Sequence, residues 1–271
     1  QTPFVTFSDG GIAIYDAQFE LVPFNALSAV EQLEEGIGAA ASSALPLDIT
    51  VSSDQPFLNK GKRTRGSLTQ RVNGTTGNYI YTGPATAKSF QGFSLVLDPG
   101  LPDWIASEIG TDIEGFLRSL EDLWGYELTE PFTVMIAYKG PQGQGLSLQG
   151  NALDGQLLLQ LGGQGFTQAN NEALAYLHWY TIREIVQLFQ TGRGVVLGGP
   201  EAAWIHDGAA NSIAYQLIAS DMQSSDQFLS SVYSNVFEDC VKTLEGGTLE
   251  SARARGAVTG PYACGDLIAL S

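Results

Sequence analysis

Over the first hundred residues, short runs of hydrophobic residues are separated by turn-forming segments such as Asp9–Gly11 and Asn73–Gly77, a pattern typical of β-strands. One segment, Ser28–Ser43, is instead rich in Ala, Glu and Leu and predicts a helix that begins at Asn25 or Ser28. Residues 1–100 are therefore expected to form a β-rich N-terminal module with at least one helix. The strands predicted in it are Phe4–Phe7, Gln18–Val22, Leu47–Val51, Asn78–Thr82 and Phe93–Leu97.

The pattern changes after Asp98–Pro102, where two prolines and a glycine interrupt both periodicities and predict a domain boundary. Beyond it, apolar residues recur at helical spacing from Asp103 to Trp124. Three strands that form a small sheet are expected next, at Pro131–Tyr138, Gly145–Gln149 and Gln156–Leu161, followed by helices at Ala169–Gln190, Pro200–Ser220, Ser225–Leu244 and from Pro261. The sequence thus predicts an α+β protein with domains at residues 1–100 and 101–271.

Three segments of the predicted helices carry the candidate chemistry. The helix Ala169–Gln190, which is apolar on more than one side and so is expected to be buried, contains Thr181-Ile-Arg-Glu-Ile-Val-Gln187. The next helix contains Trp204-Ile-His-Asp-Gly-Ala-Ala210, with nineteen residues between Gln187 and Asp207, and the last begins with Pro261-Tyr-Ala-Cys-Gly265. In this order and at this spacing, the three segments resemble the gluzincin clan of zinc metallopeptidases, within it the M1 and M61 aminopeptidase-like families.

The resemblance implies a fold and a set of site residues. It implies an N-terminal β domain followed by a thermolysin-like domain over residues 101–271, with a small mixed sheet and a central helix. In the family, His-Glu-x-x-His on that helix supplies two zinc ligands and a general base. Glu184 stands at the general-base position and Asp207 at that of a third, glutamate ligand. Tyr262 matches a tyrosine that stabilises the oxyanion, so Glu184 and Tyr262 are the vestigial catalytic residues.

The two histidine positions hold Arg183 and Gln187 instead. A guanidinium stays protonated and has no lone pair for a metal, and an amide oxygen is a weak zinc ligand beside imidazole. No metal or other cofactor is therefore expected. Since two unpaired carboxylates would be costly to bury, we expect Arg183 to form a salt bridge with Asp207 in place of the ion. Gln187 and His206 are expected to complete this binding region.

Three functions are compatible with these residues. The first is a catalytically inactive, metal-free relative of the M1 and M61 peptidases that serves as an exported peptide- or protein-binding or scaffold module, holding an extended peptide by strand addition near Gly145–Leu161. The second is an active zinc metallopeptidase with the unusual ligands Glu184, His206 and Asp207. The third is a metal-independent hydrolase with Glu184 as base and Tyr262 as acid. The other histidine, His178, is expected to face away from this site and to be packed or hydrogen-bonded.

The net charge and the two cysteines limit which binding partners and which cellular compartment are expected for this protein. The net charge of -16 repels phosphate backbones, so no nucleic-acid partner is expected, and no apolar run is long enough for a transmembrane helix. The basic segment Lys60–Arg65 is interpreted as a solvated loop, with a nucleic-acid or anionic-lipid contact as the alternative. A Cys240–Cys264 disulfide, against two buried thiols, would indicate a secreted or periplasmic protein. The oligomeric state is not predicted.

Overall fold

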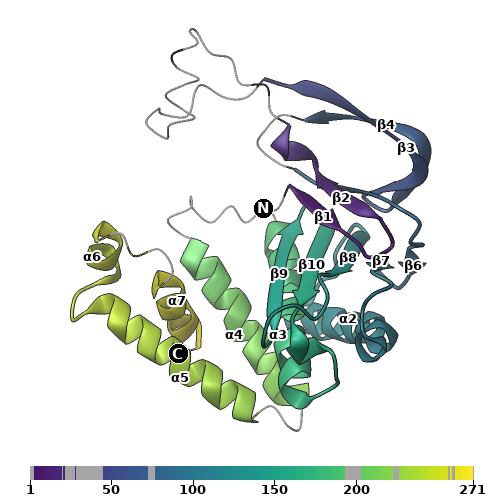
Figure 1. The fold of residues 1–271 in the computed structure, drawn as a ribbon. Coiled ribbons are helices and arrows are strands. Elements are labelled where there is room, and N and C mark those ends of the chain that lie inside the picture. Colours follow the sequence, from purple (N-terminus) through teal and green to yellow (C-terminus); the bar gives the residue numbers. More distant parts are fainter. Residues whose placement is uncertain are drawn as a thin grey trace. The chain divides into compact units, whose positions relative to one another are not determined.

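The chain divides into two compact units, Gln1–Thr86 and Ala87–Ser271, in a computed structural model. The structure describes residues 3–19, 21, 28, 45–72, 77–192, 203–221, 226–255, 257 and 260–270. Each unit contains one five-stranded sheet, and the helices α2 to α7 all belong to the second unit (Figure 1). The predicted α+β class with a β-rich N-terminal region is confirmed.

The first unit is an antiparallel sheet with the strand order β1-β2-β5-β3-β4. Its strands are β1 (Phe4–Thr6), β2 (Ile12–Tyr15), β3 (Leu47–Asn59), β4 (Lys62–Val72) and β5 (Tyr79–Thr82). Every residue of β5 is buried, and Tyr81 packs edge-on against Phe7 at a centroid distance of 5.0 Å. The aromatic and β-branched residues of β5 thus supply the centre of this unit's core.

The strand predicted at Gln18–Val22 is not formed at the residues of it that the structure describes, and Glu20 and Val22 lie outside them. Asp16–Gln18 form a single 3-10 turn, η1, and Leu21 makes only an isolated bridge to Leu45. The reason lies in Asp16, whose buried carboxylate accepts the backbone N–H of Asn78 at 2.7 Å and turns the chain there. The predicted helix Ser28–Ser43 falls outside the described residues except for Ser28.

The basic segment is a hairpin turn and the start of a strand, so its interpretation as a loop is wrong for most of its length. Only Lys60 and Gly61 form the turn, and both have positive φ, at 46° and 72°. A two-residue turn with positive φ at both positions is the type I′ turn, whose twist matches that of the flanking strands. β4 begins directly after it, at Lys62.

The second unit has a mixed sheet with the strand order β6-β7-β8-β10-β9. These strands are β6 (Lys88–Ser89), β7 (Phe93–Leu97), β8 (Phe132–Tyr138), β9 (Ser147–Leu153) and β10 (Gln156–Gly162). β7, which we expected in the N-terminal module, pairs in parallel with β8, and Asp98 at its end accepts the backbone N–H of Tyr138 at 3.0 Å. The division between the units therefore lies at residues 86 and 87, and Asp98–Pro102 is a loop within the second unit.

The helices of this unit follow the predicted spacing closely. They are α2 (Asp103–Trp124), α3 (Asn171–Gly192), α4 (Ala203–Asp221), α5 (Asp226–Leu244), α6 (Leu249–Ala254) and α7 (Gly260–Leu270), of which only α6 was not expected. None of the helices that the structure describes is long and apolar enough to span a membrane.

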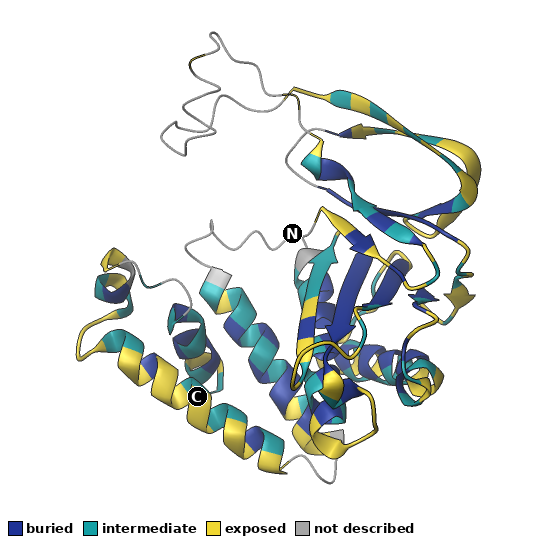
Figure 2. Ribbon diagram, in the orientation of Figure 1, coloured by how far each residue is buried: buried dark blue, intermediate teal, exposed yellow. Residues whose placement is uncertain are grey.

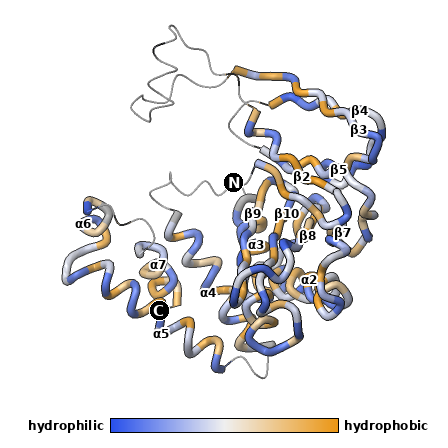
Figure 3. The backbone as a smooth tube through the Cα atoms, viewed as in Figure 1, coloured by the Kyte–Doolittle hydropathy of each residue, from blue (hydrophilic) through white to orange (hydrophobic). Residues whose placement is uncertain are grey.

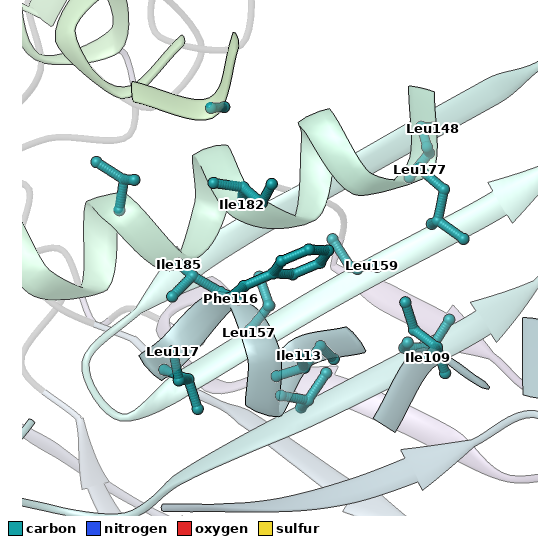
Figure 4. Close-up of a cluster of buried hydrophobic side chains, with 14 of the residues drawn as sticks. Ile109, Ile113, Phe116, Leu117, Leu148, Leu157, Leu159, Leu177, Ile182 and Ile185 are labelled. Atoms are coloured by element: carbon teal, nitrogen blue, oxygen red, sulfur yellow. The ribbon is translucent and has the colours of Figure 1, made fainter. Parts of the chain in front are cut away.

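One hydrophobic cluster joins α2 and α3 to the sheet. Leu157 and Leu159 alternate along β10 and so point to one face of the sheet, where they meet Ile113 of α2 and Ile182 and Ile185 of α3 (Figure 4). The burial map shows β8 and β10 buried along most of their length (Figure 2). This cluster fixes α3 against the sheet, which is what positions the polar residues on its other side.

Helices α4 and α7 approach each other through glycines. A β-carbon on Gly208 of α4 would lie 2.3 Å from the backbone carbon of Gly265 in α7, so neither position has room for a side chain without a backbone shift. The Cys240–Cys264 disulfide is present and ties α7 to α5, with the two α-carbons 4.7 Å apart. Gly208 of the Asp-Gly segment is thus explained by the packing of α7.

We predict that Gly208→Ala destabilises the protein by about 1–3 kcal/mol, because the overpacked helix contact outweighs the better helix propensity of alanine. Gly115→Ala is the matched control, because it also lies within a helix but a β-carbon there meets no atom within 4 Å. The control should stabilise by up to about 1 kcal/mol. Urea unfolding of both variants tests this, and equal effects would contradict it.

Candidate functional site

A polar stripe runs along the side of α3 that faces away from the hydrophobic cluster. Tyr180 precedes the adjacent pair Arg183 and Glu184 by three and four residues, and Gln187 follows that pair by four and three, which places all of them on one side of the helix. Ile182, Ile185 and Phe189 occupy the other sides and are buried. The expectation that this helix is buried in the middle of its domain is met, since α3 packs against α2, α4, β9 and β10.

Arg183 lies at the centre of this stripe and links two helices. Its Nη1 donates to Glu184 Oε1, and its Nη2 donates to Asp207 Oδ1 of α4 at 3.1 Å. The same Asp207 oxygen accepts a hydrogen bond of 2.6 Å from Gln187 Nε2. The salt bridge and the amide contact expected from the sequence are therefore both present, and the side chain of Glu184 is only 2% exposed.

The stripe also contacts the outer strand of the sheet, β9. The backbone of Ala152 hydrogen-bonds to the Glu184 carboxyl and that of Gly150 to the Tyr180 hydroxyl. The Tyr180 ring packs so closely that a β-carbon on Gly150 would lie 2.8 Å from it. Since β9 is the terminal strand of the sheet, these side chains occupy backbone groups that an added strand would use.

A third carboxylate, which the sequence analysis missed, completes the cluster. Asp266 of α7 is 4% exposed and accepts a hydrogen bond of 2.9 Å from Asn211 Nδ2 of α4. It also hydrogen-bonds to the buried Tyr215 and interacts electrostatically with Arg183 and Asp207. A signal was available, because Asp266 is the single charged residue in the otherwise apolar helix Gly260–Leu270. A charge in such a helix needs buried partners.

The site holds one guanidinium and three carboxyls, and the pKa values reflect this imbalance. Burial raises the pKa of Glu184, the attraction of Arg183 and the Ala152 hydrogen bond oppose the shift, and Asp207 adds to it. Burial likewise raises the pKa of Asp266 to about 6, against the Asn211 hydrogen bond and the charge of Arg183. The pKa of Tyr180 rises to about 12, first through burial and then through Glu184. Glu184 and Asp266 are therefore weaker acids than exposed carboxyls, beside one fixed cation.

The structure does not bring all the predicted residues together. Tyr262 is half-buried on α7 and has no hydrogen bond within the described part of the chain, and the residue of α7 that joins the network is Asp266, one turn further on. His206 accepts a hydrogen bond of 3.3 Å from Gln190 through its backbone oxygen. His178 faces Asp112 of α2, with Nε2 3.1 Å from Oδ2, which confirms that it points away from the site.

The residues at this site do not fit a zinc ion. The guanidinium of Arg183 is bonded to both Glu184 and Asp207, the two carboxylates that a metal would need. Gln187 Nε2 donates a second hydrogen bond to Asp207 Oδ1. Within the described residues, no three His, Cys, Asp or Glu side chains are grouped as metal ligands. The arrangement is that of a buried ion-pair network.

Comparisons with known proteins bear on the fold alone. No family model and no curated protein matches the sequence. The chain is similar to solved structures of yeast LTA4 hydrolase, with a TM-score of 0.53 and 9% identity to the native enzyme over 97% of this chain and 42% of that chain. The complex of that enzyme with bestatin gives 0.53 and 10% identity over 98% and 42%.

The fold resembles that of part of yeast LTA4 hydrolase. The chain spans less than half of the length of the solved structures to which it is similar, and at this identity their activity does not transfer with the fold. The likeness agrees with the gluzincin resemblance that the three helical segments carry.

We predict that Arg183→Gln destabilises the protein by about 3–5 kcal/mol, because it leaves the buried Glu184 and the partly exposed Asp207 without a cation. Adding Glu184→Gln and Asp207→Asn to the variant should recover a large part of the loss, since Asp266 is then the one carboxylate of the cluster that remains. Arg118→Gln, at an exposed position on α2, is the control and should change little. Chemical denaturation at pH 7 measures all three, and an unaffected Arg183→Gln protein would refute the network's importance.

A second prediction concerns pH. The pKa of Asp266 is raised from 3.8 to about 6, so its stabilising contribution is complete below pH 3.8 and is lost as the pH rises through about 6. Asp266→Asn should therefore gain up to about 3 kcal/mol relative to the parent between pH 4 and pH 7. Asp239→Asn, exposed on α5, serves as the control. Unfolding free energies across this range test the prediction, which a constant difference between parent and Asp266→Asn would contradict.

Proposed function

We propose that this chain is a catalytically inactive, metal-free relative of the M1 and M61 peptidases, built on a thermolysin-like domain. The observation that carries the proposal is the position of Arg183, whose guanidinium contacts both Glu184 and Asp207 where the family has its ion. A zinc ion would supply a nucleophilic water and polarise a peptide carbonyl. A guanidinium supplies only charge and hydrogen bonds. On this proposal the chain keeps the fold of the peptidases but lacks the metal chemistry that hydrolyses a peptide bond.

The two active alternatives have less support. The ligand set Glu184, His206 and Asp207 requires both carboxylates to be available, yet each is bonded to Arg183. The metal-independent mechanism requires Glu184 and Tyr262 to act on one substrate, and no described contact joins them. Burial of Glu184 at 2% exposure also keeps this carboxyl from water.

A role as a binding or scaffold module is the function we infer for such a protein. Strand addition along β9, the mode expected from the sequence, would have to displace Tyr180 and Glu184 from the backbone of Gly150 and Ala152. A peptide or protein partner is therefore better accommodated on another surface. Export from the cytosol is supported by the Cys240–Cys264 disulfide, a bond that persists in oxidising compartments.

The proposal is tested by restoring the ligands. The variant Arg183→His, Gln187→His and Asp207→Glu re-creates the family's residue types around Glu184. We expect it to bind about one zinc ion per chain, whereas the parent protein binds none under the same conditions. Metal analysis after dialysis against a low concentration of zinc provides the readout, with peptide hydrolysis assayed in parallel.

Two results would contradict the proposal. A full equivalent of zinc in the parent protein, or peptide hydrolysis by the parent that Glu184→Gln abolishes, would show a working enzyme. A restored variant that folds as the parent does and still binds no zinc would show that Arg183 does not stand at the ion's position.

A further inference from the structure

The hairpin formed by β3 and β4 carries much of the positive charge of an acidic chain. Of the 13 lysines and arginines, five lie between residues 47 and 72, against only two carboxylates there, Asp48 and Asp54. The cations are Lys60, Lys62, Arg63, Arg65 and Arg71. The chain as a whole has a net charge of -16, so this hairpin is a local basic surface on an acidic protein.

Two arginines, Arg63 and Arg65, lie two residues apart in the half of β4 next to the turn. Both are exposed, and alternate residues of a strand point to the same face. The first six residues of β4, Lys62–Ser67, are all exposed and none is hydrophobic, and the burial and hydropathy of the hairpin can be followed in Figures 2 and 3. Arg71 lies beyond Gly66, whose φ of 86° interrupts the regular alternation of the strand.

Three of the cations near the turn have no ion-pair partner among the residues that the structure describes. Lys62, Arg63 and Arg65 form no ion pair or side-chain hydrogen bond with any described residue. Arg71 is the exception and lies 3.5 Å from Asp48, in a pair whose side chains are 67% and 60% exposed. Such an exposed pair contributes little to stability, so the fold gains almost nothing from these charges.

β4 also has a free backbone edge. It is the terminal strand of its sheet and pairs, in the part of the chain that the structure describes, only with β3. An edge of this kind can accept a further strand through backbone hydrogen bonds. Cationic side chains on an edge hinder pairing with neutral or basic segments, and they attract an acidic segment instead.

We propose that the outer edge of β4 binds an extended acidic polypeptide segment by strand addition. Side chains directly opposite each other on adjacent strands lie about 5 Å apart. Glutamate or aspartate residues at alternate positions of the added strand thus meet Arg63 and Arg65, while its backbone pairs with β4. This surface is separate from the Arg183 cluster, so the inference does not depend on the proposed function.

An acidic peptide fits this surface better than a nucleic acid or a membrane. A long polyanion or an anionic bilayer also meets the field of the rest of the chain, which is strongly negative. A short peptide is influenced chiefly by charges within a Debye length of about 8–10 Å, and here those are the arginines. A peptide also has the backbone groups that the edge of β4 can bond.

The test uses two fluorescent ten-residue peptides of identical composition on the full chain. In one, glutamates alternate with threonine and valine; in the other, the glutamates form a single block. We expect the alternating peptide to bind more tightly, with affinity that falls as salt is added, and to protect amides of Lys62–Val72 from hydrogen exchange. Arg63→Glu with Arg65→Glu should weaken this binding by about tenfold or more.

Lys88→Glu with Arg118→Glu is the matched control, since it makes the same change in net charge at exposed positions of the second unit. It should leave binding within about twofold of the parent. The neutral variant Arg63→Gln with Arg65→Gln should lose less affinity for the alternating peptide. It keeps the test valid if the reversed-charge variant misfolds. Equal binding of the two peptides, equal loss in the control, or tighter arginine-dependent binding of an oligonucleotide or of phosphatidylserine vesicles would each overturn the proposal.

Discussion

One buried guanidinium, shared among three carboxyls, is the interaction on which the helical part of this protein depends. Glu184 lies on α3, Asp207 on α4 and Asp266 on α7, and Arg183 interacts with all three. Apolar packing alone would bring these helices together, but the negative charges of the three carboxylates would then have no cation to offset them. Arg183 offsets part of this negative charge and holds the three helices in one arrangement. Burial, together with the negative charge that remains, raises the pKa values of Glu184 and Asp266.

An arginine at the centre of the site has structural consequences that a metal ion would not have. A zinc ion is small and doubly charged, whereas a guanidinium is planar, singly charged and attached to the helix. Arg183 therefore reaches its partners from within α3, with its guanidinium carbon 5.7 Å from the centre of the Tyr180 ring, and no open coordination position is needed. Gln187 and the backbone of Ala152 complete the hydrogen-bonded cluster around the two carboxylates.

Some elements of this structure can be predicted from the sequence and others cannot, and the reasons are physical. Helix α2 and the ion pair of Arg183 with Asp207 follow from local periodicity and from charge balance, which a single chain displays directly. Membership of β7 in the second sheet depends on pairing with β8, a contact distant in sequence. The role of Asp266 is not predicted because its hydrogen-bond partner lies on α4, far away in the sequence. The hairpin turn is not predicted because Lys60 adopts a positive φ although it is neither glycine nor asparagine. Non-local packing decides each of these cases.

The contact of α3 with β9 has one more consequence. An enzyme that binds extended substrates at a sheet edge has to leave that edge accessible, and it thereby exposes a template for unwanted association between molecules. In this chain Tyr180 and Glu184 hydrogen-bond to the backbone at Gly150 and Ala152. These two side chains therefore remove part of that template and protect the protein against edge-to-edge aggregation.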